Sequence, residues 1–256
     1  MIEGQAYPRQ RMQFVPDRPF FRSNAVNFDG TNDYLNRGAD LTGTADGKQL
    51  TFSGWVKVAI NSTILRVMGA AVSGSARFLV NRQGANSNVR IVGNNAAGTT
   101  ILDILSTANS LVIASGWVHI LGSVDLSDTG KRWLYINDVS DLATVTTYTN
   151  DTIDFTATEW NVGANSTGGA KFNGDMAEIW FHPTYIDLSV ETNRRKFITP
   201  ILTPSYLGLS GEGPTGSPPL VYLSGPTDTW HLNKGSGGGF TENGALTDST
   251  TSPSDP

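Results

Sequence analysis

The chain has 256 residues, a formal net charge of −5 and no cysteine. The acidic balance disfavours binding to a phosphate backbone, so no nucleic-acid partner is expected, and the lack of cysteine excludes disulfides and thiolate metal sites. No apolar run of about 18 residues occurs, so no membrane span is expected either. The 28 glycines and 12 prolines indicate short strands joined by many turns.

Residues 1–22 are expected to form an extended N-terminal arm, because Pro8, Pro16 and Pro19 prevent a helix or a central strand. Residues 1–5 do not resemble the start of a secretory signal peptide. Arginines of the arm can bind carboxylates on a partner, and its phenylalanines can fill apolar pockets there. The candidate anchoring residues are Arg9, Arg11, Phe14, Arg18, Phe20 and Phe21. A disordered terminus is the alternative, while exchange of arms between subunits would build the homo-oligomer that we expect.

Short β-runs with turn residues between them follow the arm. Residues 25–35 contain a strand, a turn at Asp29-Gly30 and a second strand. The later runs are residues 50–58, 63–72, 76–81, 89–92, 100–105, 111–113, 117–124, 132–137, 144–148, 160–163 and 175–182. This spacing predicts an all-β fold with antiparallel strands in a sandwich or barrel. One helix is predicted over residues 190–198, with Ser189 as its N-cap and Pro200 after its end.

Four runs place aliphatic side chains on one side and aromatic or polar side chains on the other, because side chains alternate along a strand. In the run 175–182, the alternation predicts one face with Ala177, Ile179 and Phe181 and an opposite face with Met176, Glu178, Trp180 and His182. The second side of the four runs, which we call the aromatic face, collects Trp55, Trp117, Trp133, Tyr135, Trp180, His119 and Glu178. Such a face could stack against sugar rings.

Residues 201–256 are rich in Pro, Gly, Ser and Thr but retain large apolar residues, so we expect this segment to pack on the sandwich and only the last ten residues to fray. An exposed aromatic face would be unusual on a monomer without a partner. The favoured interpretation is therefore that the segment covers the aromatic face with Tyr206, Tyr222 and Trp230. An exposed glycan-binding platform is the alternative.

Five motifs, in order, resemble the laminin-G-like domains of the concanavalin A-like jelly-roll group. They are Phe28-Asp29-Gly30-x-x-Asp33-Tyr34, Phe52-Ser53-Gly54-Trp55-Val56, Gly116-Trp117-Val118-His119, Leu134-Tyr135-Ile136-Asn137 and Phe172-x-Gly174-x-x-Ala177-Glu178-Ile179. The resemblance covers residues 23–200 and implies a two-sheet antiparallel jelly-roll sandwich. Residues 225–248 are similar to the tails of laminin-G-like proteins among phage structural proteins, which implies a virion component. The group includes sugar binders, protein binders and structural modules, so the fold does not choose among these functions.

The carboxylates of the sequence bear on two functions, glycan hydrolysis and calcium binding. Glycan hydrolysis by related enzymes uses carboxylates at alternate positions of one strand, whereas Asp175 and Glu178 are three residues apart and would lie on opposite faces of a regular strand. We therefore expect no enzyme activity. Calcium could bind Asp29, Asn32 and Asp33, which offer oxygen ligands within five residues. The favoured alternative is that these residues only form the hairpin turn.

The sequence therefore predicts a non-enzymatic component of a phage virion surface, in the capsid or the tail, attached to other virion proteins by its arm. The alternative is a lectin-like module that binds surface glycans, with or without calcium.

Overall fold

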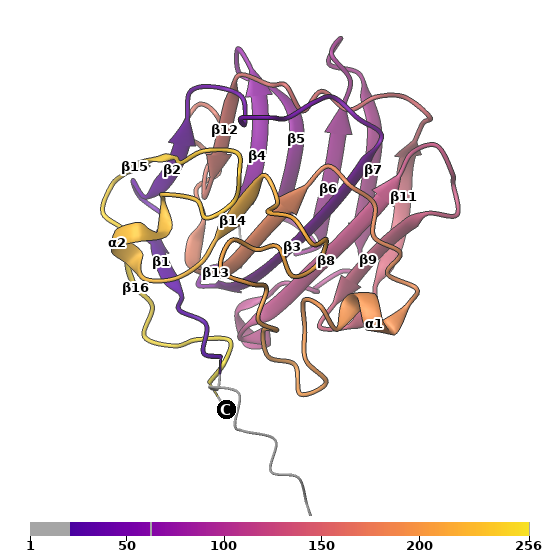
Figure 1. The fold of residues 1–256 in the computed structure, drawn as a ribbon. Coiled ribbons are helices and arrows are strands. Elements are labelled where there is room, and N and C mark those ends of the chain that lie inside the picture. Colours follow the sequence, from indigo (N-terminus) through magenta and orange to yellow (C-terminus); the bar gives the residue numbers. More distant parts are fainter. Residues whose placement is uncertain (1–20, 62, 256) are drawn as a thin grey trace, which may run out of the picture.

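The computed structural model describes residues 21–61 and 63–255. Two antiparallel sheets of eight strands each pack face to face (Figure 1). The strand order in sheet A is β10-β9-β8-β3-β13-β1-β16, with β14 also paired to β13, and the order in sheet B is β11-β7-β6-β5-β4-β12-β2-β15. The predicted all-β sandwich is confirmed. No helix in the described ranges is long and apolar enough to span a bilayer.

The strands of sheet A are β1 (Val26–Asp29), β3 (Gln49–Val58), β8 (Val118–Asp125), β9 (Arg132–Ile136), β10 (Val139–Ser140), β13 (Asn173–His182), β14 (Val221–Leu223) and β16 (Thr247–Asp248). Those of sheet B are β2 (Tyr34–Arg37), β4 (Leu65–Val72), β5 (Ser75–Arg82), β6 (Val89–Asn94), β7 (Thr100–Ser106), β11 (Leu142–Tyr148), β12 (Glu159–Val162) and β15 (Thr241–Asn243). The helical pieces are a 3-10 turn, Ile113–Ser115, and the short helices α1 (Glu191–Arg194) and α2 (Thr227–Trp230).

The main core lies between the sheets and is built by the alternation of side chains along each strand. Val56 and Ile120 from sheet A and Val80 and Ile91 from sheet B are among its fully buried members. The predicted inward positions of β3, β8 and β9 are confirmed, because the residues predicted to face inward belong to this core or, for Ile136, pack against it.

The predicted alternation of β13 is wrong in its first half. Ala177 pairs with Trp55 while Trp180 pairs with Ser53, so β13 carries one extra residue at this point. The extra residue reverses the alternation, as a β-bulge does. Met176 therefore joins the main core with Ile179 and Phe181, while Ala177 lies on the outer side of sheet A with Trp55.

The residue inside this bulge is Glu178, which has a φ of +50°. β13 pairs with β1 up to Met176 and with β14 from Ile179 onward. Glu178 thus lies where one neighbouring strand ends and the next begins.

The predicted helix is present but short. It begins at Glu191 and ends at Arg194, and Ser189 does not cap it. The Ser189 hydroxyl instead donates to Asp187 (2.6 Å). Phe197 and Ile198, which the prediction placed inside the helix, are buried against sheet A, and this packing ends the helix early.

The outer side of sheet A is covered by the segment that follows β13, which runs across it in Figure 1. Ile186, Leu188, Phe197, Leu207 and Tyr222 pack there on residues of β8, β9 and β13. The predicted covering is thus present but begins before residue 201. Of the three aromatic residues expected to form it, only Tyr222 does so.

The other two aromatic residues lie elsewhere. Trp230 belongs to the main core and makes an edge contact with Phe28 (5.9 Å between ring centroids), and Tyr206 is 55% exposed. The chain end also packs on the body, where fraying was expected. β16 pairs with β1, and the Ser252 hydroxyl donates to the Ser23 carbonyl (2.6 Å).

The candidate anchoring residues Arg9, Arg11, Phe14, Arg18 and Phe20 lie outside the described residues. Phe21 lies inside them and packs on Tyr206 of its own chain (5.3 Å between ring centroids). Attachment by the arm stays a prediction.

Candidate functional site

The aromatic face is largely buried. Glu178, Trp180, His119, Trp55 and Tyr135 are at most 8% exposed, and Trp117 and Trp133 are half-buried. A sugar ring cannot stack on side chains that the chain itself covers. The aromatic residues predicted as an exposed glycan platform are therefore corrected to members of two smaller packed clusters on the outer side of sheet A.

Glu178 is the polar centre of this covered region. Its carboxylate accepts hydrogen bonds from the hydroxyls of Ser23 (2.9 Å), Ser224 (2.7 Å) and Tyr222 (2.6 Å). Burial raises the pKa of Glu178, and the three hydroxyl donors oppose that rise. Ser23 precedes β1 while the other two belong to the C-terminal segment, so Glu178 joins three distant parts of the chain. Its role is structural.

His119 lies on β8 and is fully buried. Its Nε2 atom shares a hydrogen bond with the Ser53 hydroxyl (2.8 Å), and its ring stacks on Trp55 (4.8 Å between centroids). Burial lowers the pKa of His119 to about 3. His119 is therefore neutral over the whole physiological pH range and packs rather than catalyses.

His119 is expected to make the protein sensitive to acid. The unfolded chain takes up a proton on this histidine near its ordinary pKa of 6.5, whereas the folded chain does so only near 3. The free energy of unfolding should therefore fall between these two values as pH falls, by at most about 1.4 kcal/mol per pH unit. Chemical denaturation at pH 6.5, 5.5 and 4.5 measures this slope, and His119→Gln should be less steep. Equal slopes in both proteins would contradict the assignment.

Backbone amides donate hydrogen bonds to two carboxylates in the turn that contains Asp29, Asn32 and Asp33. The Asp29 carboxylate accepts hydrogen bonds from the amides of Thr31, Asn32 and Asp33, and the Asp33 carboxylate accepts them from the amides of Asp29 and Ala245. Within the described residues, no group of three or more His, Cys, Asp or Glu is placed to hold a metal ion. Calcium at this turn stays a prediction.

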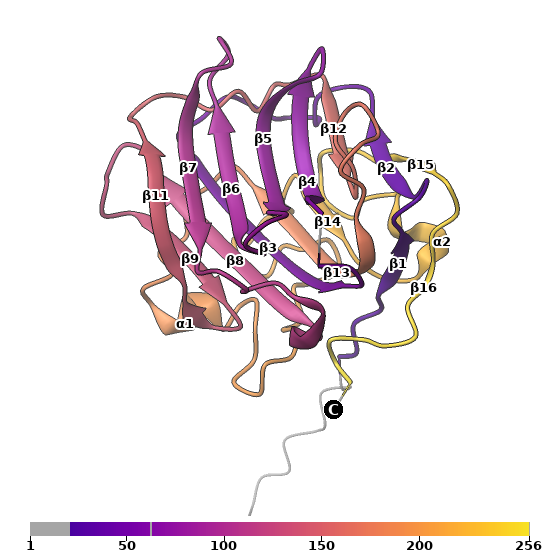
Figure 2. The same ribbon diagram turned by 180° about the vertical axis from the view of Figure 1, so that it is seen from behind.

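The outer side of sheet B has a different character. Figure 2 shows no segment over the middle of β4, β5 and β6 on this side. Successive Cα partners across the sheet form two rows of outward residues. One row is Val92, Leu79, Gly69, Asn161 and Asn36, and the other is Arg66, Asn81, Arg90 and Leu105. We call this surface the open face.

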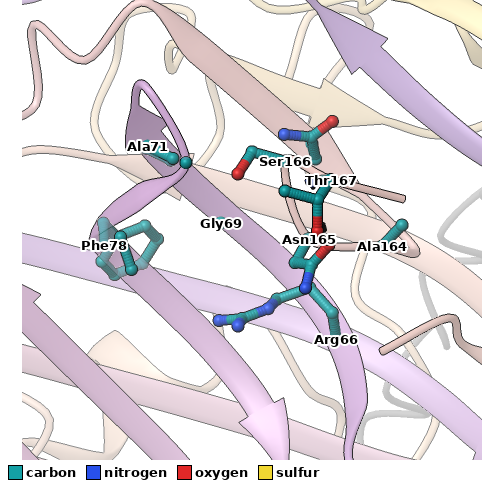
Figure 3. Close-up of a pocket in the computed structure, with 12 residues that line it drawn as sticks. Arg66, Gly69, Ala71, Phe78, Ala164, Asn165, Ser166 and Thr167 are labelled. Atoms are coloured by element: carbon teal, nitrogen blue, oxygen red, sulfur yellow. Dashed lines mark hydrogen bonds between the residues drawn. The ribbon is translucent and has the colours of Figure 1, made fainter. Parts of the chain in front are cut away.

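A pocket of about 110 Å³ lies on the open face between β4 and the loop that follows β12. Gly69 and Ala71 form part of its floor, and Asn165, Ser166 and Thr167 form part of its rim (Figure 3). Arg66 lies across Gly69, since a Cβ atom at position 69 would come within 3.4 Å of the Arg66 Cδ atom. The lack of a side chain at Gly69 therefore makes room for the arginine.

Arg66 has no carboxylate partner among the described residues, and its buried Nε atom has no hydrogen-bond acceptor. Its neighbour Arg90 differs, because Asp103 binds Arg90 through two contacts of 2.7 Å each. Burial, with a smaller effect from the charge of Arg90, lowers the pKa of Arg66 to about 10. Arg66 remains charged at neutral pH and is the unsatisfied cation of the open face.

Other polar atoms on this side also lack partners. They are the side-chain oxygens Asn81 Oδ1, Asn94 Oδ1 and Glu159 Oε2. Asn81 is only 4% exposed and pairs directly with Arg66 across β4 and β5. Buried polar atoms normally have partners in a folded protein. Similar atoms occur elsewhere, such as His119 Nδ1 on the covered side, but those on the open face lie where a polar ligand can approach.

The sequence profile of a laminin G family, described as the concanavalin A-like lectin/glucanases superfamily, matches residues 29–187. The chain belongs to this superfamily. No curated protein sequence matches the chain.

Solved structures share the fold of this superfamily member. A candidate carbohydrate-binding protein from Bacteroides ovatus superposes with a TM-score of 0.61 at 15% identity, over 90% of this chain and 60% of the other. A heptameric SAP-like pentraxin from Limulus polyphemus superposes with a TM-score of 0.48 at 15% identity, over 65% of this chain and 79% of the other. The laminin-G-like resemblance is confirmed, whereas similarity to phage virion proteins is not shown.

The sequence interpretation missed the open face and Arg66. A signal was present, because Arg66 lies between Leu65 and Val67, both of which point into the main core. A charged residue between two buried neighbours marks the outward side of a strand. The same signal surrounds Arg90, and only the strand pairing shows that one arginine has a carboxylate and the other has none.

Proposed function

We propose that the protein is a non-enzymatic, lectin-like carbohydrate-binding module and that it binds its ligand on the open face of sheet B. The observation that carries the proposal is the contrast between the two sides of the sandwich. The outer side of sheet A is covered by the protein's own chain, whereas no segment covers the open face, where polar side chains are packed together with buried atoms that lack hydrogen-bond partners.

The composition of the open face suits a sugar. The half-buried Leu79 provides apolar surface, and on the neighbouring strand the half-buried Arg66 supplies a guanidinium group. Sugar rings combine apolar C–H faces with hydroxyls, and binding sites match them with apolar surface and a few oriented polar groups. Two comparisons support the same proposal: the superfamily is described by its lectins and glucanases, and the Bacteroides ovatus protein is described by carbohydrate binding.

The arrangement of carboxylates supports binding rather than cleavage. Glycosidases need two accessible carboxyl groups, about 5–5.5 Å apart for retention or about 6.5–9.5 Å apart for inversion. On the open face, Asp103 is engaged by Arg90, and Glu178, which the sequence suggested as an acid, is sealed under the covering segment. Display on a phage virion, with virion proteins as partners, stays a proposal that rests on the sequence resemblance of the tail.

Glycan binding is tested with Thr167→Trp, which places a large ring at the exposed rim of the pocket. The wild-type chain should bind at least one glycan of an array of plant and bacterial polysaccharides. The variant should bind it at least about tenfold more weakly, a loss of about 1.4 kcal/mol. Affinity electrophoresis or calorimetry measures the ratio.

Thr229→Trp is the matched control, since Thr229 is also an exposed threonine but lies in α2 and does not line the pocket. It should bind like the wild type. If Thr229→Trp abolishes binding and Thr167→Trp does not, the ligand site lies on the other side of the sandwich.

A further inference from the structure

We propose that the pocket at Arg66 takes the carboxylate of an acidic sugar, a uronic acid or another sugar acid, so that the ligand of the open face is an anionic glycan. This inference rests on the proposed function and specifies its ligand class.

The first argument is charge. Arg66 is a largely desolvated guanidinium with no anionic partner among the described residues, and the positive charge of Arg90 disfavours its charged form further. An uncompensated charge is costly to desolvate, and the cost falls when an opposite charge arrives. A carboxylate is the group that matches the planar fork of a guanidinium with two parallel hydrogen bonds.

The second argument is that the attraction is local. The whole chain has a formal charge of −5, which repels polyanions at long range. An anionic ligand therefore needs one defined cationic position. The other arginines described on and beside sheet B already have partners: Arg90 binds Asp103, Arg77 binds Asp154, and Arg82 donates to backbone carbonyls. Arg66 is the position that remains.

The third argument is shape. The pocket has a volume of about 110 Å³, which admits a carboxylate and part of its ring but not a chain of sugars. Figure 3 shows Arg66 and the loop residues Ser166 and Thr167 around Gly69. The Ser166 hydroxyl, half-buried at the rim, can bind a second oxygen of the same sugar. The rest of a glycan would lie over the half-buried Leu79 on the neighbouring strand.

The test compares polymers that differ only in their carboxylates. Polygalacturonate, alginate and hyaluronan are each assayed beside the same polymer after reduction of its carboxyl groups to neutral alcohols. The full chain is expected to bind at least one acidic polymer and to bind its reduced form at least about tenfold more weakly. Arg66→Gln should lose the same factor, and Arg66→Lys should lose part of it, because lysine keeps the charge but not the fork.

Arg132→Gln removes the same unit of charge from sheet A and should bind like the wild type, since Arg132 packs on Tyr148 instead. Thermal denaturation controls for folding. Arg66→Gln should melt at the same temperature as the wild type or higher, because it removes an uncompensated charge. The acidic polymer should raise the melting temperature of the wild type and not that of the variant.

Each other outcome overturns the inference in a distinguishable way. Equal binding of the acidic and the reduced polymers, with loss in Thr167→Trp, would refute the carboxylate but keep glycan binding. Equal binding of dextran sulfate, but not dextran, would show a general anion site. An equal loss of affinity in Arg66→Gln and Arg132→Gln would show that binding depends on the total positive charge and not on the position of Arg66. Failure of these polymers alongside binding of a neutral glycan on the array would remove the inference alone, whereas failure of the whole array as well would also remove the proposed function.

Discussion

A chain that ends at Pro200 is expected not to fold cooperatively. The missing segment supplies β14, which pairs with the second half of β13. It also supplies eight buried apolar side chains: Leu207, Leu220, Val221, Tyr222, Leu223, Trp230, Phe240 and Leu246. Each large apolar side chain contributes about 1.5–3 kcal/mol when fully buried. Eight of them together contribute about 12–24 kcal/mol, which matches or exceeds the roughly 5–15 kcal/mol by which a typical domain is stable.

Tryptophan fluorescence and thermal denaturation measure the effect. Trp180 is fully buried in the intact chain, so its exposure should shift the emission to longer wavelength. A single substitution in the same segment tests the same packing with a smaller expected loss of stability. Leu207→Ala should lower the free energy of unfolding by about 2–5 kcal/mol, whereas Leu209→Ala, at a site 81% exposed, should change it by no more than about 0.5 kcal/mol. An unchanged melting temperature in the truncated chain would show that the segment only rests on the sandwich.

Glu178→Ala is expected to lower the free energy of unfolding by about 3–5 kcal/mol, the range for removing one partner of a buried charged network. The alanine leaves the hydroxyls of Ser23, Tyr222 and Ser224 without their shared acceptor in a buried place. Unpaired buried polar groups each cost about 1–3 kcal/mol. The backbone strain at φ +50° is the same for glutamate and alanine, so it does not contribute to the difference. Denaturant titration measures the loss.

The matched control is Glu191→Ala. The Glu191 side chain is 64% exposed and pairs only with Arg195 on the same helical turn. Exposed pairs of this kind contribute about 0.3–0.5 kcal/mol, so this variant should remain close to the wild type. A loss below about 1 kcal/mol in Glu178→Ala would mean that the three chain segments are held together by apolar packing alone.

The architecture could be predicted because its signals are local. Side chains alternate with a period of two, so the inward residues of β3, β8 and β9 are visible in the sequence, and turn pairs such as Asp29-Gly30 separate the strands. These signals predicted the sandwich, and the motifs predicted the superfamily. In the strands that carry the aromatic face, the alternation is reversed where one inserted residue, Glu178, lies in β13. Nothing local distinguishes that glutamate from its neighbours, since the bulge is defined by pairing with Trp55 and Ser53 on another strand.

The site could not be predicted, because it depends on which distant residues meet. The aromatic face suggested sugar stacking as well as coverage, and only the path of residues 183–223 across sheet A decided between them. Arg66 and Arg90 both lie between two apolar residues in the sequence, yet the strand pairing brings Asp103 within reach of Arg90 and not of Arg66. The sequence by itself determined the two-sheet fold and its inward residues, since these follow from alternation. Tertiary structure alone decided which side is open and which charge is unpaired, since both follow from contacts between strands.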